Sequence, residues 1–537
     1  MNDKELAAFD FTKVDVKGIL PQREPYLIVS RLLSYSNEKT VVEYVVADDC
    51  VFCEDGRLQG EGLVEVVAQA CAARIGFISR YILHRPVNIG YVCALKDFRI
   101  FRTPASGERL VTTIEVKADY GSMQMVFAQV GSPEEGEVAE GTMSIALDED
   151  RTVPGQDRCV VKIADNIISP LGTSTRENYR RVKAGESALS RREATEGLPE
   201  AYFASLIDDS TLEREYASRG IDSGYTRFER RIILSVSKAL EGTGVDPAGP
   251  DVLFIISSTK GNVELLDGVR AGSVPPGERL GVSAGKIAGF FGNRNTPVVV
   301  SNACISGLSA QIAAMRQIRS GRYSTVIVSG SDVQSRFIIS GFQSFKALSD
   351  EACRPFDKDR RGLNLGEAAA TIIFKDEVPR PDDWCIVSGA VRNDANHISG
   401  PSRTGEGSFR ALKAALGDFD PGLLAMVSVH GTSTPYNDEM EAIAIARAGL
   451  DKVPVSCLKG VFGHTMGAAG ILETILSMAS VDDGTVLGTR GYSECGVSRP
   501  LMVTSENVRT DRKSFMKLLS GFGGCNAAAL FVKGGGR

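Results

Sequence analysis

The sequence predicts a chain of two parts, an α+β domain over residues 1–148 and a layered α/β domain over residues 159–537. Beyond residue 158, short strand-like runs alternate with helical ones, which is typical of layered α/β architecture. In the first part, one long apolar segment precedes three runs in which apolar and polar residues alternate, a pattern that favours one helix and several strands. Residues 149–158 are polar, charged and contain Pro-Gly, so we expect a linker there.

The apolar segment, residues 62–83, predicts a helix that is hydrophobic on most faces. Glu65, Gln69, Arg74 and Arg80 interrupt it, which argues against a membrane span. Such a helix has to be covered, and a curved antiparallel sheet wrapped around it is the hot-dog arrangement. The alternating runs supply strands at residues 110–116, 123–130 and 138–147, with turns at Gly121 and at residues 131–133.

The larger domain contains two sets of strand-like runs, which suggests a duplicated α/β unit, although the sequence shows no clear repeat. The first set comprises residues 252–257, 298–301, 325–329 and 370–374, and the second comprises residues 385–391, 425–429, 453–457 and 501–505. Functional side chains in open α/β sheets gather at the carboxyl ends of strands. Residues that follow these runs are therefore candidates for a site.

Cys304 stands where the β-branched run Val298–Val300 gives way to an amphipathic stretch. Leu308, Ile312 and Met315 follow at helical spacing, so the thiol is expected at a helix N-terminus. There it feels the positive end of the helix dipole, and we expect its pKa to be lowered and its nucleophilicity raised. A buried cysteine by itself is more often inert, so the prediction of a nucleophile depends on its companions.

Two of the four histidines follow strand-like runs in glycine-framed segments. His430 begins His-Gly-Thr-Ser-Thr-Pro-Tyr-Asn-Asp, and His464 lies in Lys459-Gly-Val-Phe-Gly-His-Thr-Met-Gly. A thiol with two histidines at strand ends favours nucleophilic catalysis.

These three segments resemble the elongating (type I and II) β-ketoacyl-acyl-carrier-protein synthases of the thiolase superfamily, over roughly residues 159–537. The chain also contains, in the family's order, Arg354-Pro-Phe-Asp357, Gly366-Glu367, Asp394-Ala-Asn-His397 and Ser520-Gly-Phe-Gly-Gly-Cys-Asn526. The resemblance implies the thiolase fold, in which two α/β halves are related by a pseudo-twofold axis and the active site lies where strand ends meet.

The resemblance also implies a decarboxylating Claisen condensation. Cys304 would take an acyl chain from a phosphopantetheine thioester, and the backbone amides of Cys304 and Phe522 would form the oxyanion hole. His430 and His464 would stabilise the enolate of the malonyl thioester as carbon dioxide departs. The product would be a 3-oxoacyl carrier of fatty-acid, polyketide or aryl-polyene-type biosynthesis.

Four further residues receive roles from the same resemblance. Lys459 and Glu473 would belong to a polar network that fixes histidine protonation. Thr432 and Thr434 would hold the pantetheine amides, although capping of a helix that begins near Asp438 is an equally open interpretation. Asp438 and its neighbour Glu439 indicate helix N-terminal charges and are left out of the catalytic set.

The N-terminal part resembles the 3-hydroxyacyl-carrier-protein dehydratases, and more nearly the dehydratase-like proteins of aryl-polyene pathways. The residues that carry the resemblance are Leu20-Pro-Gln22, Glu54-Asp-Gly-Arg-Leu-Gln-Gly and Glu65-Val-Val-Ala-Gln69. Glu65 matches the family's acid, but Gln22 and Val51 stand at its histidine positions, and His84 is at an unmatched one. We expect a structural or weakly active domain, with a bifunctional dehydratase-synthase as the alternative.

Composition limits the partners and cofactors. The formal charge of −6 argues against nucleic acid. We expect no metal and no bound cofactor, since Cys50-Val-Phe-Cys53 has no second ligand pair. The start of the sequence lacks a signal-peptide pattern and the cysteine count of eleven is odd, so we expect a cytoplasmic protein.

The expected partners are an acidic acyl carrier protein and a second copy of the chain, with a second synthase-like subunit as the alternative. Arg180–Lys183 and Arg227–Arg231 are candidate carrier-docking stretches, although both also suit a solvated helix face.

Two rival functions follow from the same residues. A degradative thiolase would use a second cysteine as acid and base, for which Cys525 is the candidate, but the His430 and His464 pair favours decarboxylation. A noncatalytic chain-length partner would lack Cys304. The alternative of another class is a scaffold that only assembles a pigment or polyketide complex.

Overall fold

The computed structural model forms two compact units, the second of which begins at Cys159, and each is described by itself. The structure describes residues 6, 9–22, 25–83, 87–120, 123–153, 159–195, 197–266, 277, 279–394, 396 and 400–534.

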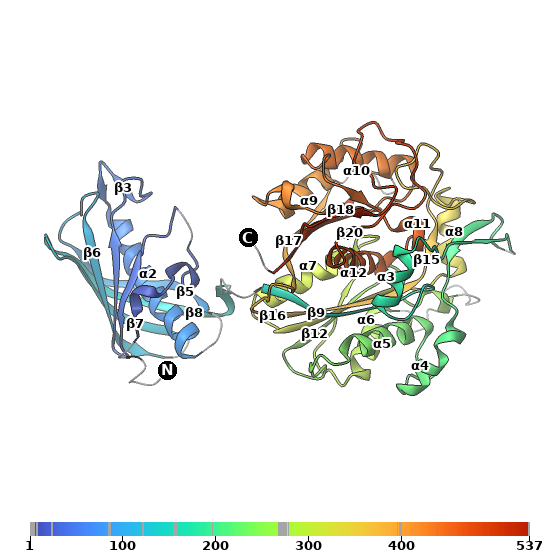
Figure 1. Cartoon of the computed structure of the whole chain (residues 1–537). Helices are drawn as coiled ribbons and strands as arrows, with labels where there is room; N and C mark the ends of the chain where they lie inside the picture. The colour runs from blue at the N-terminus through green and yellow to red at the C-terminus, as the bar shows by residue number, and fades with distance from the viewer. Residues whose placement is uncertain are drawn as a thin grey trace. The chain divides into compact units, whose positions relative to one another are not determined.

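The N-terminal unit is an antiparallel sheet packed against one long helix (Figure 1). The strands lie in the order β1-β2-β6-β7-β8-β5. The helix, α2, buries Leu63, Val66 and Val67 in a core with strand residues such as Leu110 and Ile114. The elements are β1 (Arg31–Tyr35), β2 (Lys39–Val45), a small hairpin of β3 (Cys53–Glu54) and β4 (Arg57–Leu58), α2 (Gly60–Phe77) with a π-helical turn (Ile78–Ile82), β5 (Val87–Ile100), β6 (Arg109–Asp119), β7 (Met123–Ser132) and β8 (Gly136–Val153), after two short 3₁₀ turns (Phe11–Lys13 and Val16–Gly18).

The expected helix and the three expected strands of this unit are present, whereas β1, β2 and β5 were not predicted from the pattern. By length and composition Gly60–Ile82 is able to cross a membrane, yet 72% of its most apolar window is buried inside the unit, as in a core helix. The expected linker begins too early, because β8 continues to Val153, where it pairs with Val87 of β5. β7 likewise continues into the expected turn at residues 131–133 and ends at Ser132. Gly121 lies outside the described residues.

The second unit is built on a ten-stranded sheet with helices on its faces. The strands of the whole unit, of which ten form this sheet, are β9 (Cys159–Ile168), β10 (Ser190–Arg192), β11 (Tyr202–Ser205), β12 (Val252–Ser257), β13 (Val298–Val300), β14 (Thr325–Asp332), β15 (Leu365–Gly366), β16 (Ala368–Glu377), β17 (Trp384–Asn393), β18 (Met426–Ser428), β19 (Val455–Ser456), β20 (Thr485–Val486), β21 (Val508–Arg509), β22 (Ser514–Gly521) and β23 (Cys525–Lys533). Its helices are α3 (Thr175–Lys183), α4 (Glu213–Ser218), α5 (Arg227–Leu240), α6 (Leu280–Phe290), α7 (Ser306–Arg319), α8 (Arg336–Ser344), α9 (Glu406–Leu416), α10 (Pro435–Arg447), α11 (Lys459–Phe462) and α12 (Ala469–Asp482), with short 3₁₀ turns at Asp209–Leu212, Val263–Leu266, Pro421–Leu423 and Met466–Ala468.

The strand order shows the duplication that the sequence suggested. The sheet runs β13-β12-β14-β16-β9-β17-β23-β22-β18-β19. In the first half, β12 pairs in parallel with β13 and β14, and β16 and β9 follow antiparallel. The second half repeats this pattern, with β18 parallel to β19 and β22, followed by antiparallel β23 and β17. The two halves meet where β9 pairs with β17.

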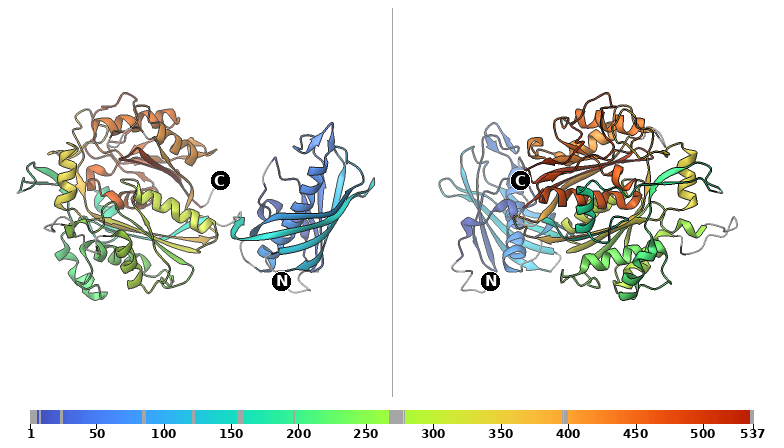
Figure 2. Two further views of the ribbon diagram at one scale, coloured as in Figure 1. Left: turned by 180° about the vertical axis from the view of Figure 1, so that it is seen from behind. Right: turned by 45° about the vertical axis from the view of Figure 1, so that its right-hand side comes forward.

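Helices form the remaining layers (Figures 1 and 2). The apolar helices α7 and α12 lie between the two half-sheets, and their side chains share one core with strands of both halves. On the outer faces, α5 and α6 cover the first half, and α9 and α10 cover the second. This five-layer arrangement is the thiolase fold that the resemblance implies, and it places the ends of β13, β18 and β19 near one another.

One expected strand of the second unit is wrong. Residues 501–505 form no strand, and only Val503 makes an isolated bridge, to Val455. The partner strand β19 has two residues, so the ladder has nothing to extend along. β9, β22 and β23 complete the halves, and β9 and β22 were not among the predicted strands.

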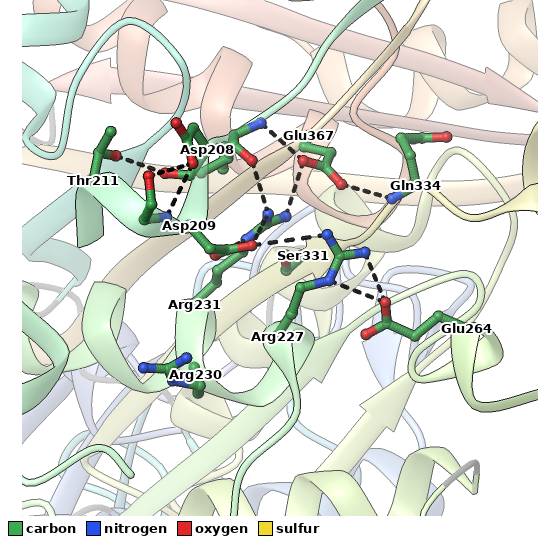
Figure 3. Close-up of polar contacts among 12 residues, drawn as sticks. Asp208, Asp209, Thr211, Arg227, Arg230, Arg231, Glu264, Ser331, Gln334 and Glu367 are labelled. Carbon is green, nitrogen blue, oxygen red and sulfur yellow. Dashed lines mark hydrogen bonds and ion pairs between the residues drawn. The ribbon is translucent and has the colours of Figure 1, made fainter. Parts of the chain in front are cut away.

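A buried ion-pair cluster anchors α5 to the sheet (Figure 3). The fully buried Arg231 guanidinium binds the Asp209 carboxylate at 2.7 Å and the Glu367 carboxylate at 3.1 Å. Glu367 in turn accepts the backbone N–H of Ile207 and of Gln334, each at 2.8 Å. The cluster thereby fixes the junction of β15 and β16.

Candidate active site

Cys304 lies in the turn between β13 and α7, as the sequence predicts. The preceding residue, Ala303, has a left-handed backbone with φ of 43°, a strained conformation for a residue with a side chain. Ser306 holds the turn, since its hydroxyl donates to the Ala303 carbonyl at 2.6 Å and accepts the Asn302 N–H at 2.8 Å. Half-buried Cys304 faces a cavity of about 580 Å³.

The fold brings both predicted histidines to this thiol. His430 follows β18, His464 follows α11, and their exposed fractions are 2% and 1%. The Cys304 sulfur and one ring nitrogen of each histidine lie within 4.8 Å of one another. The two imidazoles meet edge to face, with ring centroids 5.0 Å apart. In the described part of the chain, these three are also the one group of side chains close enough to share a metal ion, which would occupy the sulfur that acylation needs.

Both histidines are neutral at pH 7. Burial holds the pKa of His430 and of His464 well below 6.5, and the positive charge of Lys459 lowers both further. Nδ1 of His464 accepts the backbone N–H of Met466 at 3.1 Å. An N–H group only donates, so the neutral His464 ring carries its proton on Nε2.

The amides predicted to form the oxyanion hole both interact with the Cys304 thiol, but the expected lowering of its pKa is wrong. Burial raises the pKa of Cys304 to about 11, and Lys459 and the N–H groups of Phe522 and Cys304 counteract only part of this. The nucleophile is therefore a thiol at neutral pH, because desolvation outweighs the helix terminus. Close packing supports the amide placement, since a Cβ on Gly521 would lie 3.1 Å from the Cys304 nitrogen.

Lys459 and Glu473 form the polar network that the resemblance implies, with Nζ–Oε1 at 2.5 Å and both side chains buried. Lys517 completes it. This lysine binds the other Glu473 oxygen at 2.8 Å and donates to the carbonyls of Ser428 and Val429, the residues that precede His430. Burial opposes the charge on Glu473, but the two lysines outweigh it and lower its pKa. Sequence reasoning missed Lys517. It could have been found as a lysine inside the otherwise apolar run of β22, since an unpaired lysine is rarely buried.

A second buried carboxylate was also missed. Glu441, on α10, accepts the backbone N–H of His430 at 2.8 Å and of Gly431 at 2.7 Å. Burial raises its pKa to about 7. Asp438 is buried beside it and accepts the N–H of Phe356 and of Ser433, so it anchors loops rather than facing the cavity.

Thr432 and Thr434 line the cavity, with their hydroxyls 2.9 Å apart. Thr434 precedes α10, which begins at Pro435 rather than near Asp438, and its side chain makes no capping hydrogen bond. The capping interpretation therefore fails for Thr434, and its hydroxyl is available to a ligand.

The two basic stretches predicted for carrier docking do not line the cavity. Lys183 pairs with Asp483, Arg227 pairs with Glu264, and Arg231 is buried. The cavity is instead lined by Lys346 and Arg361, together with Phe345, Phe522 and Tyr436 among other residues. Lys346 is exposed.

In the N-terminal unit, Glu65 lies among amides. Its Oε1 accepts Gln69 Nε2 at 2.8 Å and Gln22 Nε2 at 3.3 Å. Val51, at the other histidine position, is 46% exposed in a turn. His84 lies outside the described residues. Within the described residues of this unit, no imidazole accompanies the carboxylate.

Family models match three stretches of the chain. Residues 158–378 match the N-terminal domain and residues 385–493 the C-terminal domain of β-ketoacyl synthases, which together span more than half of the chain. Residues 14–152 match the ApeP dehydratase family.

Curated relatives and a solved structure match the larger unit. Nodulation protein E of Rhizobium sp. (strain N33) is 30% identical over 404 residues, covering 70% of this chain and 99% of that protein. The 3-oxoacyl-[acyl-carrier-protein] synthase 2 of Vibrio cholerae serotype O1 is 28% identical over 411 residues with the same coverage. In fold, the unit is similar to the ketosynthase ApeO of Xenorhabdus doucetiae, solved with its chain length factor ApeC, at a TM-score of 0.60 and 22% identity over 70% of this chain and 98% of that one.

Glu473→Gln should destabilise the protein, because it leaves the two buried lysines without their counter-ion. Breaking a buried ion pair typically costs about 3–5 kcal/mol, which denaturant unfolding will measure. The pKa of Glu473 lies below its ordinary 4.5, so the unfolded chain binds its proton at a higher pH than the folded one. The stabilisation is thus present above about pH 4.5 and lost in more acid solution, and the variant should lack this part of the acid dependence. The double variant Glu473→Gln with Lys517→Met should be more stable than Glu473→Gln alone, because it no longer buries an unpaired lysine. If the two variants are equally stable, the ion pair of Glu473 with Lys517 contributes nothing to stability.

Proposed function

The chain belongs to the β-ketoacyl synthase family, and from this premise we propose that its larger unit condenses an acyl group held on Cys304 with a malonyl-carrier thioester. The observation that carries the proposal is the meeting of Cys304, His430 and His464 within 4.8 Å at the floor of the cavity. The product is a 3-oxoacyl carrier, and the match of the N-terminal unit to the ApeP dehydratases favours a polyketide or aryl-polyene type of pathway.

In the first step the Cys304 sulfur attacks the acyl thioester carbonyl. Because the thiol is protonated, its proton has to pass to a base. His464 has Nδ1 engaged by Met466 and a hydrogen on Nε2, so His430 is the ring that accepts it. The oxyanion forms against the N–H groups of Cys304 and Phe522. When the carbon–sulfur bond to the carrier breaks, the carrier thiolate takes the proton back from His430.

In the second step the malonyl thioester loses carbon dioxide. The electrons of the broken carbon–carbon bond move into an enolate, whose oxygen accepts the Nε2 hydrogen of His464 as a hydrogen bond. The enolate carbon then attacks the acyl carbonyl on Cys304, and the carbon–sulfur bond of the acyl-enzyme breaks to release the 3-oxoacyl carrier. The Cys304 thiolate left behind takes up a proton from water, the one proton that the overall reaction consumes, and the resting thiol is restored. Neutral imidazoles suit this step because they donate without trapping the carbanion by protonation.

The cavity suits a phosphopantetheine arm. The hydroxyls of Thr432 and Thr434 lie along it as partners for amides, and Lys346 adds positive charge beside an otherwise acidic chain, whereas Arg361 pairs with Glu351 at 3.1 Å. An acidic carrier protein therefore meets local attraction at the mouth. The enzyme needs no bound cofactor of its own, because the substrate brings the pantetheine.

We propose a homodimer, with a second synthase-like subunit as the alternative. β13 and β5 each lie at an edge of their sheet, and β5 exposes Tyr91, Val92 and Leu95. An exposed apolar edge strand is a surface that a second chain pairs with. All eleven cysteines are free thiols, which suits a cytoplasmic protein.

The rival functions make different demands on the site. A thiolase needs Cys525 as an acid and base, yet burial raises the pKa of that thiol to about 12, and the sulfur donates to the Phe522 carbonyl at 3.3 Å. Cys525 therefore suits support of the turn that holds the oxyanion amide. A scaffold would release no carbon dioxide.

Cys304→Ala should abolish condensation while leaving the fold intact, because the side chain removed is small.

His464→Ala should slow carbon dioxide release from malonyl carrier by about 10²–10⁴-fold, the usual contribution of an acid–base group, and slow acylation of Cys304 far less. His430→Ala should slow both. Radiolabelled malonyl carrier and intact mass of the acyl adduct measure the two steps. Wild-type protein that releases no carbon dioxide would establish the scaffold instead, and equal loss of both steps in His464→Ala would refute the division of roles.

Lys346→Gln should weaken binding of the carrier about fivefold at low salt, and the difference should shrink as salt rises, because the attraction is electrostatic and exposed. Lys183→Gln is the matched control, since Lys183 belongs to the sequence-predicted stretch but pairs with Asp483. Titration of a labelled carrier at two salt concentrations measures both. Equal weakening by the two variants would mean that net charge, not location, attracts the carrier.

For the N-terminal unit we propose a hot-dog domain with little or no dehydratase activity, because Glu65 has no imidazole partner among the described residues. Gln22→His places an imidazole where an amide now approaches Glu65, and it should raise the loss of water from 3-hydroxyacyl carriers, measured by intact mass. The double variant with Glu65→Gln should lose that gain. Robust dehydration by the unaltered protein would contradict the proposal.

A further inference from the structure

Asp332, the last residue of β14, is fully buried and collects donors from two separate segments. Its Oδ1 accepts the Ser258 hydroxyl at 2.6 Å and the Lys260 N–H at 3.0 Å. Its Oδ2 accepts the Thr259 N–H and hydroxyl at 3.0 Å each and the Gly467 N–H at 2.7 Å. An ionised carboxylate suits this site because it accepts several donors and offers none.

The Gly467 contact is the one that leads to the catalytic site. Ser257 holds the same residue from its other end, donating its hydroxyl to the Gly467 carbonyl at 2.8 Å. Space is so limited that a Cβ on Gly467 would lie 2.6 Å from Ser258 Cα and 2.8 Å from Asp332 Oδ2. The backbone on both sides of Gly467 therefore has a single position.

That position imposes the conformation of the preceding residue. Met466 has a left-handed backbone with φ of 51°, which a residue with a side chain adopts only when its surroundings require it. In this conformation the Met466 N–H reaches Nδ1 of His464 at 3.1 Å. Asp332 thus accepts the Gly467 N–H, and the N–H of the adjoining Met466 donates to Nδ1 of His464. The proton of the His464 ring is therefore left on Nε2.

We propose that Asp332 is a positioning residue for the malonyl step, fixing the turn after His464 so that the Nε2 hydrogen of that ring faces the developing enolate. The inference rests on the role proposed above for His464. None of the Asp332 hydrogen bonds in the described part of the chain reaches the Phe522 turn or His430, and its negative charge is only a minor contribution to the raised pKa of Cys304. The acylation step therefore depends on Asp332 less than the malonyl step does.

Asp332→Asn tests this directly, because an amide NH₂ group placed among N–H donors no longer accepts their hydrogens. We expect carbon dioxide release from malonyl carrier to fall at least about tenfold, less than the roughly 10²–10⁴-fold contribution of the acid–base group that Asp332 positions, while acylation of Cys304 changes by less than about threefold. Asp357→Asn is the matched control. Asp357 is also fully buried and accepts the N–H groups of Asp359, Ser493 and Glu494, and both rates should stay within about threefold.

A second variant and a second readout guard against a fold that does not survive. Ser257→Ala removes the other hold on Gly467 without burying a charge, and it should shift the same ratio of rates in the same direction, less steeply. Nitrogen-15 NMR of the His464 ring, assigned with His464→Ala, reports the tautomer without turnover. We expect the Nε2–H form in the wild type and a mixture with the Nδ1–H form in both variants.

The two readouts separate the possible failures. Wild-type protein that releases no carbon dioxide refutes the proposed function, while the NMR result still decides the role of Asp332. Folded variants that keep both the Nε2–H tautomer and the wild-type ratio of rates overturn the inference, and Ser257→Ala alone decides it if Asp332→Asn does not fold.

Discussion

The geometry of the catalytic site depends on one buried carboxylate, Glu473, held between Lys459 and Lys517. Lys517 continues to the carbonyls of Ser428 and Val429, immediately before His430, and Lys459 opens the segment that leads to His464. A single network therefore ties the two histidine turns to the central helix α12. Removing the shared carboxylate would leave both buried lysines without a counter-ion, so the arrangement holds as a unit.

The same network sets the electrostatics of the cavity. Its lysine next to the histidines, together with burial, keeps both imidazoles neutral. Burial also keeps Cys304 protonated, so the site holds no standing thiolate. In the proposed function, catalysis relies on groups placed in advance: two amides at the sulfur, one ring that is able to accept a proton and another that donates from Nε2. Fixed donors in a site with little water stabilise developing charge at little cost of reorganisation.

At two of the strained backbone positions in the site, the surroundings impose the strain. Ala303, before the nucleophile, is held by Ser306, and Met466, after His464, is held through Gly467. The N-terminal unit contrasts with this. There Glu65 is surrounded by amides from Gln22 and Gln69, an arrangement that satisfies a carboxylate without giving it a proton-transfer partner. Within the described residues, the larger unit thus gathers a thiol with two imidazoles, whereas the N-terminal unit pairs its carboxylate with amides.

The sequence by itself determined the two-part organisation, the duplicated α/β halves and the group of Cys304, His430, His464, Lys459 and Glu473, because strand ends and helix starts are local patterns and the motifs are contiguous. It missed β1, β2, β5, β9 and β22 and wrongly expected a strand at residues 501–505, since pairing depends on a partner that lies far along the chain. Only the tertiary structure decided the protonation state of Cys304 and the burial of Arg231 in an ion-pair cluster. It also decided the roles of Lys517, Glu441 and Asp332. Each of these depends on desolvation or on hydrogen-bond donors from distant segments. Neither desolvation nor a distant donor is set by a residue's neighbours in the sequence.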